Sequence, residues 1–410
     1  MDTSTLQFLL SPDGQKALQE AARLLPREAD FLRHFDSLSR TFPAELARAA
    51  LEVAILRREA VSKFPAAEWM YFTRAALEQA TAYEVAAYRA RRYTGYRRLL
   101  DLGCSIGGDT LALAGIAPTI GVDLNPVRVG MARANLAALG LGDRTNFIQA
   151  DLTSPLPFSA DSDTGVFFDP ARRSGEQRIF SVRDYQPPLS VLEDWLPGYP
   201  ATGVKISPGV RLDEVTRYSA EIEFISLRGE LKEAALWFGP LRTARRRATL
   251  LPDGQSLYAV EDPRDSLTML PLSPPRRFLY EPDPAILRAG LVQTLGEQLD
   301  AAQLDPDIAY LTTDQRIETP FARSWQVEAW FPFGLKRLRA ALRQRSVTDV
   351  VVKKRGSPLQ PEALIREMRL KPRERNGPVE RVIFLTHLRG QPIIILCLPR
   401  PEPDVAPTPR

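Results

Sequence analysis

The spacing of apolar residues changes along this chain and divides it into regions. Over residues 6–96 apolar positions recur every three or four residues, as in Leu46, Ala50 and Val53, which predicts amphipathic helices. Over residues 96–239 short apolar runs alternate with helical patterns instead. That alternation predicts a parallel β-sheet covered by helices on both faces.

Five short apolar runs are the expected strands of this sheet. They are Arg98–Asp101, Thr119–Val122, Asn146–Gln149, Gly165–Phe168 and Gly203–Ile206. Two later runs, Glu221–Leu227 and Leu231–Phe238, flank a turn at Arg228-Gly-Glu and predict a β-hairpin. The expected fold class is α/β, with a Rossmann-like sheet over 96–240 that ends in an antiparallel hairpin. A helical N-terminal domain over 1–95 precedes it.

The rest of the chain predicts smaller pieces. Residues 241–320 are expected to hold a strand-rich extension, with a turn at Pro252-Asp-Gly, and a small ferredoxin-like linker piece, whose expected helix is Ile286–Leu299. Residues 321–400 mix helices and strands, as small α+β domains do. The expected elements are a helix at Gly334–Arg345, a strand at Val347–Lys353, a helix at Pro361–Leu370 and strands at Arg381–His387 and Pro392–Leu398. The proline-rich residues 401–410 are expected to be a disordered tail.

Charge separates the C-terminal region from the rest. The chain of 410 residues has a net charge of +4, but residues 321–400 hold 17 Lys and Arg against 6 Asp and Glu, a net charge of +11. A basic module on an otherwise acidic chain favours a polyanion such as RNA as partner, and a solvated face of an arginine-rich protein is the alternative.

Composition also excludes several classes of protein. Two cysteines and two histidines cannot form a disulfide framework or a usual structural zinc site. No apolar run is long enough to span a membrane. We therefore expect a cytoplasmic protein with no metal, no membrane association and no obligate protein partner.

The stretch Asp101-Leu-Gly-Cys-Ser-Ile-Gly-Gly-Asp109 follows the first expected strand and opens a helix. A strand, a glycine turn and a helix let a nucleotide-like ligand lie against bare backbone. The carboxylate of Asp101 would repel a pyrophosphate but attract the ammonium and sulfonium of S-adenosylmethionine (SAM). Cys104 lies inside this loop, away from any acceptor, and is expected to be a packing residue.

Carboxylates end or follow four successive expected strands: Asp101, Asp123, Asp151 and Asp169. Ligands of open α/β sheets bind beyond the carboxyl ends of the strands, so the four acids should face one crevice. Asp123 would accept the ribose hydroxyls, Asp151 would meet the adenine amino group, and the glycines would let the backbone approach the amino-acid part of SAM. The candidate cofactor-binding residues are Asp101, Gly103, Ser105, Gly107, Asp123, Leu124, Asp151 and Leu152.

With these motifs the chain resembles the class I SAM-dependent methyltransferases. Their first motif is usually D-x-G-x-G-x-G, and here Ser105 replaces the second glycine. A sheet that binds NAD and a sheet without a cofactor are the alternatives. An NAD site would have to tolerate Asp101 near a diphosphate, and it would not predict the terminal hairpin.

The stretch after the fourth expected strand, Asp169-Pro-Ala-Arg-Arg173, carries the candidate chemistry. Methyltransferases acting on nitrogens often have Asp/Asn-Pro-Pro-Tyr/Phe here, and this stretch resembles the Asp-Pro-Pro-Arg pattern of some RNA methyltransferases. The candidate catalytic residues are Asp169 and Pro170, which would hold the amine, and Arg172, which could stack on a base or grip a phosphate. A turn that merely ends a strand is the alternative for Asp169-Pro170, and a surface ion pair is the alternative for the arginines.

Further residues are candidates for substrate contact. Lys205 could meet a phosphate or form a structural ion pair, and Phe168, Phe180 and Tyr185 could stack on a base. The candidate substrate-binding residues are Arg173, Lys205, Lys353, Lys354 and Arg355.

Most of the chain resembles a bacterial family of SAM-dependent methyltransferases with a THUMP-like domain at the C-terminus. The resemblance rests on the stretches above together with Lys63-Phe-Pro, Lys205-Ile-Ser-Pro-Gly209, Glu281-Pro-Asp-Pro-Ala285, Arg288-Ala-Gly290 and Lys353-Lys-Arg-Gly356. THUMP domains bind tRNA, so the resemblance implies RNA methylation. Together with Asp169-Pro170 it leads us to expect methylation of a nitrogen in a tRNA base. A small-molecule or protein methyltransferase and a non-catalytic SAM-fold protein that binds RNA are the alternatives.

Overall fold

The computed structural model describes residues 1–171, 173–174, 177–178, 181–263, 269–368, 370 and 379–400. These residues form two compact units. The first unit comprises Met1–Leu227 and Lys232–Thr243, and the second comprises Arg228–Leu231 and the described residues from Ala244 onward. The division into four domains and a tail that the sequence suggested stays a prediction, and residues 401–410 lie outside the described part of the chain.

The N-terminal half of the first unit is helical, as the apolar spacing predicts. Leu46, Ala50 and Val53 are buried on α4, where α1–α3 pack against them. The helices of this unit are α1 (Thr3–Leu10), α2 (Pro12–Arg23), α3 (Phe31–Leu38), α4 (Ala44–Ala60), α5 (Arg74–Gln79), α6 (Tyr83–Ala90), α7 (Gly108–Ile116), α8 (Pro126–Ala138), α9 (Leu192–Trp195) and α10 (Leu212–Val215).

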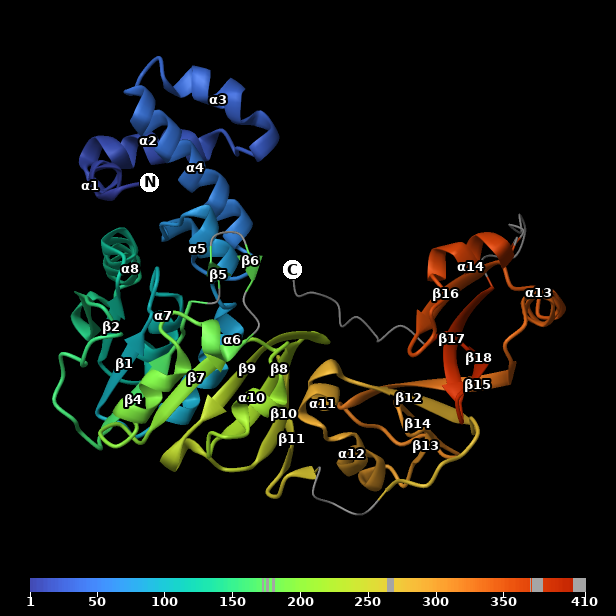
Figure 1. The fold of residues 1–410 in the computed structure, drawn as a ribbon. Helices are drawn as coiled ribbons and strands as arrows, with labels where there is room; N and C mark the ends of the chain where they lie inside the picture. Colours follow the sequence, from blue (N-terminus) through green and yellow to red (C-terminus); the bar gives the residue numbers. More distant parts are fainter. Residues whose placement is uncertain are drawn as a thin grey trace. The chain divides into compact units, whose positions relative to one another are not determined.

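The first unit also contains an α/β sheet (Figure 1). All the strands expected for this sheet are present, and their ends differ from the expected ones by no more than one residue. Its strands are β1 (Arg98–Leu102), β2 (Thr119–Asp123), β3 (Thr145–Gln149), β4 (Thr164–Phe168), β7 (Thr202–Ile206), β8 (Glu221–Leu227) and β9 (Glu230–Trp237). They lie in the order β8-β9-β7-β4-β1-β2-β3. Strands β1–β4 and β7 are parallel, while β9 runs antiparallel to β7. Two short strands, β5 (Arg173–Ser174) and β6 (Gln177–Arg178), pair separately.

The turn between β8 and β9 explains why these two strands form an antiparallel hairpin. Arg228 and Gly229 both have positive φ angles, 53° and 81°, as a two-residue type I′ turn requires. The hairpin returns the chain so that β9 lies between β7 and β8. The antiparallel hairpin is the one that the sequence predicts.

Different helices cover the two faces of this sheet. Helices α6 and α7 pack on one face against Leu99, Phe167 and Trp237. On the other face Cys104 packs with Phe147 and with residues of α8. Burial raises the pKa of the Cys104 thiol, in keeping with the packing role expected for it.

The second unit is a mixed α+β assembly. Its strands are β10 (Arg246–Leu251), β11 (Gln255–Ala259), β12 (Phe278–Pro282), β13 (Ala302–Asp305), β14 (Ile308–Thr313), β15 (Ala322–Pro332), β16 (Asp349–Lys354), β17 (Glu380–Leu388) and β18 (Gln391–Cys397). Its helices are α11 (Pro284–Ala289), α12 (Val292–Gln298), α13 (Leu335–Gln344) and α14 (Pro361–Met368). One sheet has the order β13-β14-β12-β15-β18-β17-β16, in which only β16 and β17 are parallel to each other.

Two expectations for this unit were wrong. The helix expected over 286–299 is two helices, because Gly290 takes a left-handed conformation with φ 76° and ends α11. The long strand β15 was not expected at all, although it joins the strands on either side of it into one sheet. No helix in the described ranges is long and apolar enough to cross a membrane.

Candidate active site

The glycine loop of the first unit is packed directly against the end of β4. Gly103 has φ 84°, and a Cβ atom there would lie 2.4 Å from the carbonyl oxygen of Asp169. The backbone N–H of Asp169 in turn donates to the carbonyl of Leu102 at 2.9 Å. Only glycine combines this φ angle with so close a backbone approach. The contacts of Leu102 and Gly103 with the backbone of Asp169 therefore fix the glycine loop and the candidate catalytic residue relative to each other.

Asp123 braces the same loop from the end of β2. One of its carboxylate oxygens accepts the N–H of Ser105 at 2.9 Å, and the other accepts the N–H of Asn125 at 2.8 Å. Ser105 has φ 49°, so the serine that replaces the usual glycine does take a left-handed conformation. Each carboxylate oxygen can accept a further hydrogen bond, which leaves Asp123 able to bind two hydroxyl groups.

The residues expected around an adenine differ in exposure. Leu124 is 63% exposed, whereas Leu152 is buried. Asp151 is exposed, and the hydrogen bond from the backbone of Thr153 lowers the pKa of its carboxyl group. An exposed leucine next to Asp123 is an apolar surface that a bound aromatic ring would cover.

Asp101 differs from the expectation of an acid lining an open crevice, because it is fully buried. Its Oδ2 accepts the hydroxyl of Thr110 at 2.5 Å, and its Oδ1 accepts no hydrogen bond from the described residues. Burial, together with the charge of Asp109, raises the pKa of Asp101 to about 8. A cation bound at the unused oxygen would favour the ionised form of this carboxyl group.

Asp169 is paired with Lys205. The Nζ of Lys205 lies 2.7 Å from Oδ2 of Asp169, and the lysine side chain is 4% exposed against 21% for the aspartate. Lys205 was expected either to contact a phosphate or to form a structural ion pair, and the described structure shows the ion pair. Pro170 is buried, and Ala171 pairs with the backbone of Gln186.

The remaining candidates near β4 divide into two groups. Phe168 is buried against Trp195, and the hydroxyl of Tyr185 accepts the N–H of Ser207 at 3.0 Å, so neither is a free stacking platform, contrary to the expectation. Arg172, Phe180 and the side chain of Arg173 lie outside the described residues.

Comparison with known proteins identifies the family to which this chain belongs. Family models match three segments: a methyltransferase domain over 99–170, a THUMP domain-like model over 322–399 and a domain of unknown function over 2–60. Rv3037c of Mycobacterium tuberculosis, described as an uncharacterised SAM-dependent methyltransferase, is 38% identical over 333 residues, which are 78% of this chain and 88% of the relative. The chain belongs to this family of SAM-dependent methyltransferases.

Two further comparisons extend the picture. The methyltransferase is 32% identical over 91 residues, 22% of its length, to an uncharacterised RNA methyltransferase, SYNW1228 of Parasynechococcus marenigrum, of which the match covers 20%. A crystal structure from Porphyromonas gingivalis W83, also named as a methyltransferase, has a TM-score of 0.72 at 20% identity and covers 92% of this chain and 100% of its own. That likeness shows the fold.

SAM is the cofactor, and the residues present fit it. Asp123 has acceptor capacity for the ribose, Leu124 offers an exposed apolar surface, and Asp101 has an unused buried oxygen for a cation. Among the described residues of the methyltransferase no group of three His, Cys, Asp or Glu could hold a metal ion.

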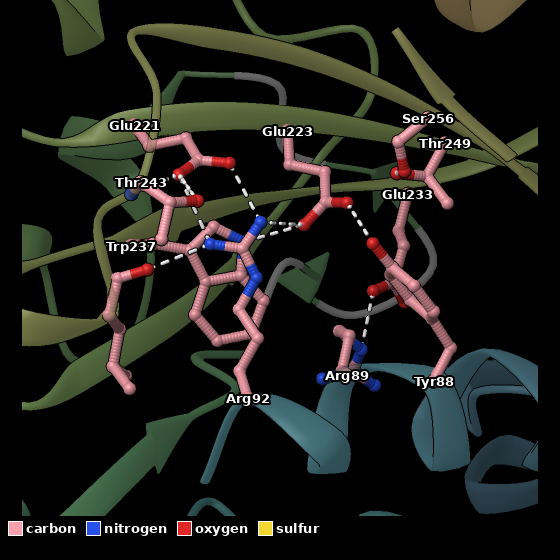
Figure 2. A network of polar contacts seen from close by, with 11 residues as sticks. Tyr88, Arg89, Arg92, Glu221, Glu223, Glu233, Trp237, Thr243, Thr249 and Ser256 are labelled. Carbon is pink, nitrogen blue, oxygen red and sulfur yellow. Dashed lines mark hydrogen bonds and ion pairs between the residues drawn. The ribbon is translucent and has the colours of Figure 1, made fainter. Parts of the chain in front are cut away.

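A buried ion network that sequence reasoning missed lies beside the site (Figure 2). Arg89 of α6 contacts Asp109 of α7 at 2.5 Å and Glu233 of β9 at 2.7 Å, and its guanidinium stacks on the ring of Phe167 at 4.1 Å. Burial alone would lower the pKa of Arg89, but Glu233 and Asp109 raise it. Burial raises the pKa of Glu233, while the positive charges of Arg89 and Lys205 act in the opposite direction and lower it.

Arg92 anchors the other half of the network. It makes two hydrogen bonds to Glu221, at 2.7 and 3.1 Å, and a third to Glu223 at 3.1 Å. Glu223 also accepts from Trp237 at 2.7 Å and from Tyr88 at 2.6 Å (Figure 2). The available signal was two glutamates, Glu221 and Glu223, on one face of a buried strand, since buried carboxylates need cations from another element.

The basic cluster of the second unit is only partly exposed. Lys353 pairs with Glu281 at 2.5 Å, and its ammonium lies 4.9 Å from the ring centre of Trp325. Arg355 stacks on the ring of Tyr310 at 5.1 Å. Lys354 is exposed. The Nζ of Lys354 donates to Oε1 of Gln360 at 3.3 Å, so all three expected phosphate-binding cations also have partners within the unit.

Proposed function

We propose that the methyltransferase modifies RNA, and that its acceptor is a base nitrogen of a tRNA. The observation that carries this proposal is Asp169, held against the glycine loop with an oxygen, Oδ1, that accepts no hydrogen bond from the described residues. SAM supplies a methyl group activated on a sulfonium sulfur. An N–H group donating to Oδ1 would be held in a fixed line of approach, and alignment is the main contribution of a protein to such a displacement.

The residues in and around the glycine loop would each contact a different part of SAM. Asp123 would accept the ribose hydroxyls while it holds the N–H of Ser105, and Asp151 would accept from the adenine amino group. Leu124 and Leu152 would pack on the adenine ring. The backbone of the glycine loop, with Gly103 and Gly107 at positive φ, would approach the amino-acid part, and Asp101 would compensate its ammonium charge.

Charge and exposed aromatic rings support RNA as the substrate. Helix α13 exposes Lys336, Arg337 and Arg343, and Trp330 and Phe333, 38% and 39% exposed, lie on the chain that leads into it. Cations that follow a phosphate backbone and rings that stack on bases are the usual means of binding single-stranded RNA. The THUMP domain-like match and the RNA methyltransferase name of SYNW1228 support the same assignment. We propose that Arg172, Arg173, Lys353, Lys354 and Arg355 add contacts to the RNA.

The test uses labelled SAM and total RNA from a strain that lacks the gene. We expect wild-type protein to label RNA and Asp169→Ala to label none, while calorimetry gives both the same SAM affinity. Asp163→Ala is the matched control, because this exposed acid lies just before β4, at its other end. RNA labelled equally by Asp169→Ala would overturn the catalytic assignment.

A small-molecule or protein substrate is the alternative. Label that enters a protein or small-molecule fraction instead of RNA would favour it. RNA affinity measured over a series of salt concentrations separates the two, because contacts to several phosphates make affinity fall steeply with salt. A flat dependence on salt would argue against RNA.

A further inference from the structure

The Asp169–Lys205 pair has hydrogen-bonding capacity that the described residues do not use. A lysine ammonium has three N–H groups, and one of them accounts for the 2.7 Å bond to Oδ2 of Asp169. The structure has no other acceptor within hydrogen-bond distance of Lys205 among the described residues, although its charge acts on nearby Glu233. With 4% of the side chain exposed, solvent cannot fully supply the missing acceptors.

A buried ammonium group with N–H groups that have no acceptor is unfavourable, so its retention needs a reason. The geometry suggests that a bound ligand supplies the missing acceptor. Oδ1 of Asp169 is an open acceptor, and Nζ of Lys205, bonded to the other oxygen of the same carboxylate, is an open donor. Together they match a group that carries an N–H beside a hydrogen-bond acceptor.

We propose, building on RNA methylation as the function, that the methylated group is the ring N–H of a lactam, as in N1 of guanine or N3 of uracil. Asp169 Oδ1 takes the proton from the ring nitrogen. Lys205 donates to the neighbouring carbonyl oxygen, on which the negative charge collects. The nitrogen lone pair then forms the new N–C bond, and the electron pair of the breaking C–S bond returns to sulfur, which loses its positive charge.

The same pair fits other acceptors less well. In an exocyclic amine beside a ring nitrogen, as in adenine, an ammonium bonded to that nitrogen would draw the amine lone pair into the ring. In a hydroxyl group the ammonium would occupy the oxygen that has to attack. In a lactam the donor contacts a different atom from the nucleophile, and its charge stabilises the anion that the reaction needs.

The first test identifies the product. Wild-type protein is incubated with SAM and total RNA from the deletion strain, and the digested nucleosides are analysed by mass spectrometry. New 1-methylguanosine or 3-methyluridine supports the proposal. A methylated exocyclic amine or a 2′-O-methyl nucleoside overturns it and leaves RNA methylation intact. RNA that gains no methyl group overturns both.

The second test examines Lys205 itself. Lys205→Met should lower kcat about 100-fold near neutral pH, as loss of one charge-stabilising donor does, with the SAM affinity unchanged. Its activity should recover as the pH rises, because the lactam then loses its proton without help. A loss by the same factor at every pH, or no loss, contradicts the role.

Two controls keep this test interpretable. Lys16→Met removes an exposed lysine of α2 and should match wild type at every pH. Thermal unfolding shows whether Lys205→Met is folded. If it is not, Lys205→Arg keeps the charge, and it should retain more activity than Lys205→Gln at neutral pH; equal activities of these two variants overturn the proposal.

Discussion

The contact between Gly103 and Asp169 links the cofactor loop to the acceptor site, and Gly103→Ala tests it. The alanine methyl group would lie 2.4 Å from the carbonyl oxygen of Asp169, where ordinary contact begins at 3.4 Å. The two backbone segments must therefore separate by about 1 Å. A misplacement of this size at a reacting group can cost about 100-fold in rate.

The same substitution has a separate conformational cost. Gly103 has φ 84°, and a residue with a Cβ pays about 1–2 kcal/mol for a left-handed conformation. The stiffer unfolded chain offsets part of this, so about 1 kcal/mol remains before any clash. For a domain of this size 1 kcal/mol lowers the melting temperature by about 2–4 °C.

Gly140→Ala separates the two effects. Gly140 has a similar φ of 73°, but a Cβ there meets nothing within 4 Å. We expect Gly140→Ala to lower the melting temperature by a few degrees and keep wild-type turnover, and Gly103→Ala to lose about 100-fold in turnover as well. Melting curves and the methyl-transfer assay give both values. Equal turnover in the two alanine variants would refute the reasoning.

Two further predictions concern the acids of the loop. Asp123→Ala should weaken SAM binding by about 1–3 kcal/mol through the lost charged hydrogen bonds, measured by calorimetry, and an unchanged affinity would remove Asp123 from the site. The pKa of Asp101 is raised from 3.8 to about 8, so the folded protein keeps a proton that the unfolded chain has released. Its contribution to stability is full below 3.8 and is lost as the pH rises through about 8. Asp101→Asn should flatten this decline in urea unfolding on either side of neutral pH, and a decline equal to that of wild type would contradict the assignment.

Local signals explain which parts of the fold could be predicted. The strands of the first sheet are short apolar runs ended by acids or glycines, so their positions could be predicted from the sequence. Strand β15 was missed because its outer positions carry polar residues such as Arg323, Gln326 and Glu328, which weaken the apolar run although its exposure alternates. The break at Gly290 was readable in principle, since glycine at a helix end adopts the left-handed conformation.

The site was predictable only where position along a strand decides it. Asp123 and Asp169 follow their strands, so their neighbourhood follows from the order of the sheet. The partners of Arg89 and Lys205 come from distant segments, and no spacing in the sequence connects them. Whether an acid is open, as Asp151 is, or enclosed, as Asp101 is, depends on packing that a sequence pattern does not report.

The arginines that end the helical segment before β1 limit how this enzyme can be divided. Arg89 and Arg92 neutralise Glu233, Glu221 and Glu223, which are buried on β8 and β9 of the catalytic sheet. A truncated catalytic fragment starting at β1 would keep these glutamates and lose their cations, at about 3–5 kcal/mol for each broken pair. The stability of the sheet thus depends on the segment that carries these arginines, and a working catalytic fragment has to include it.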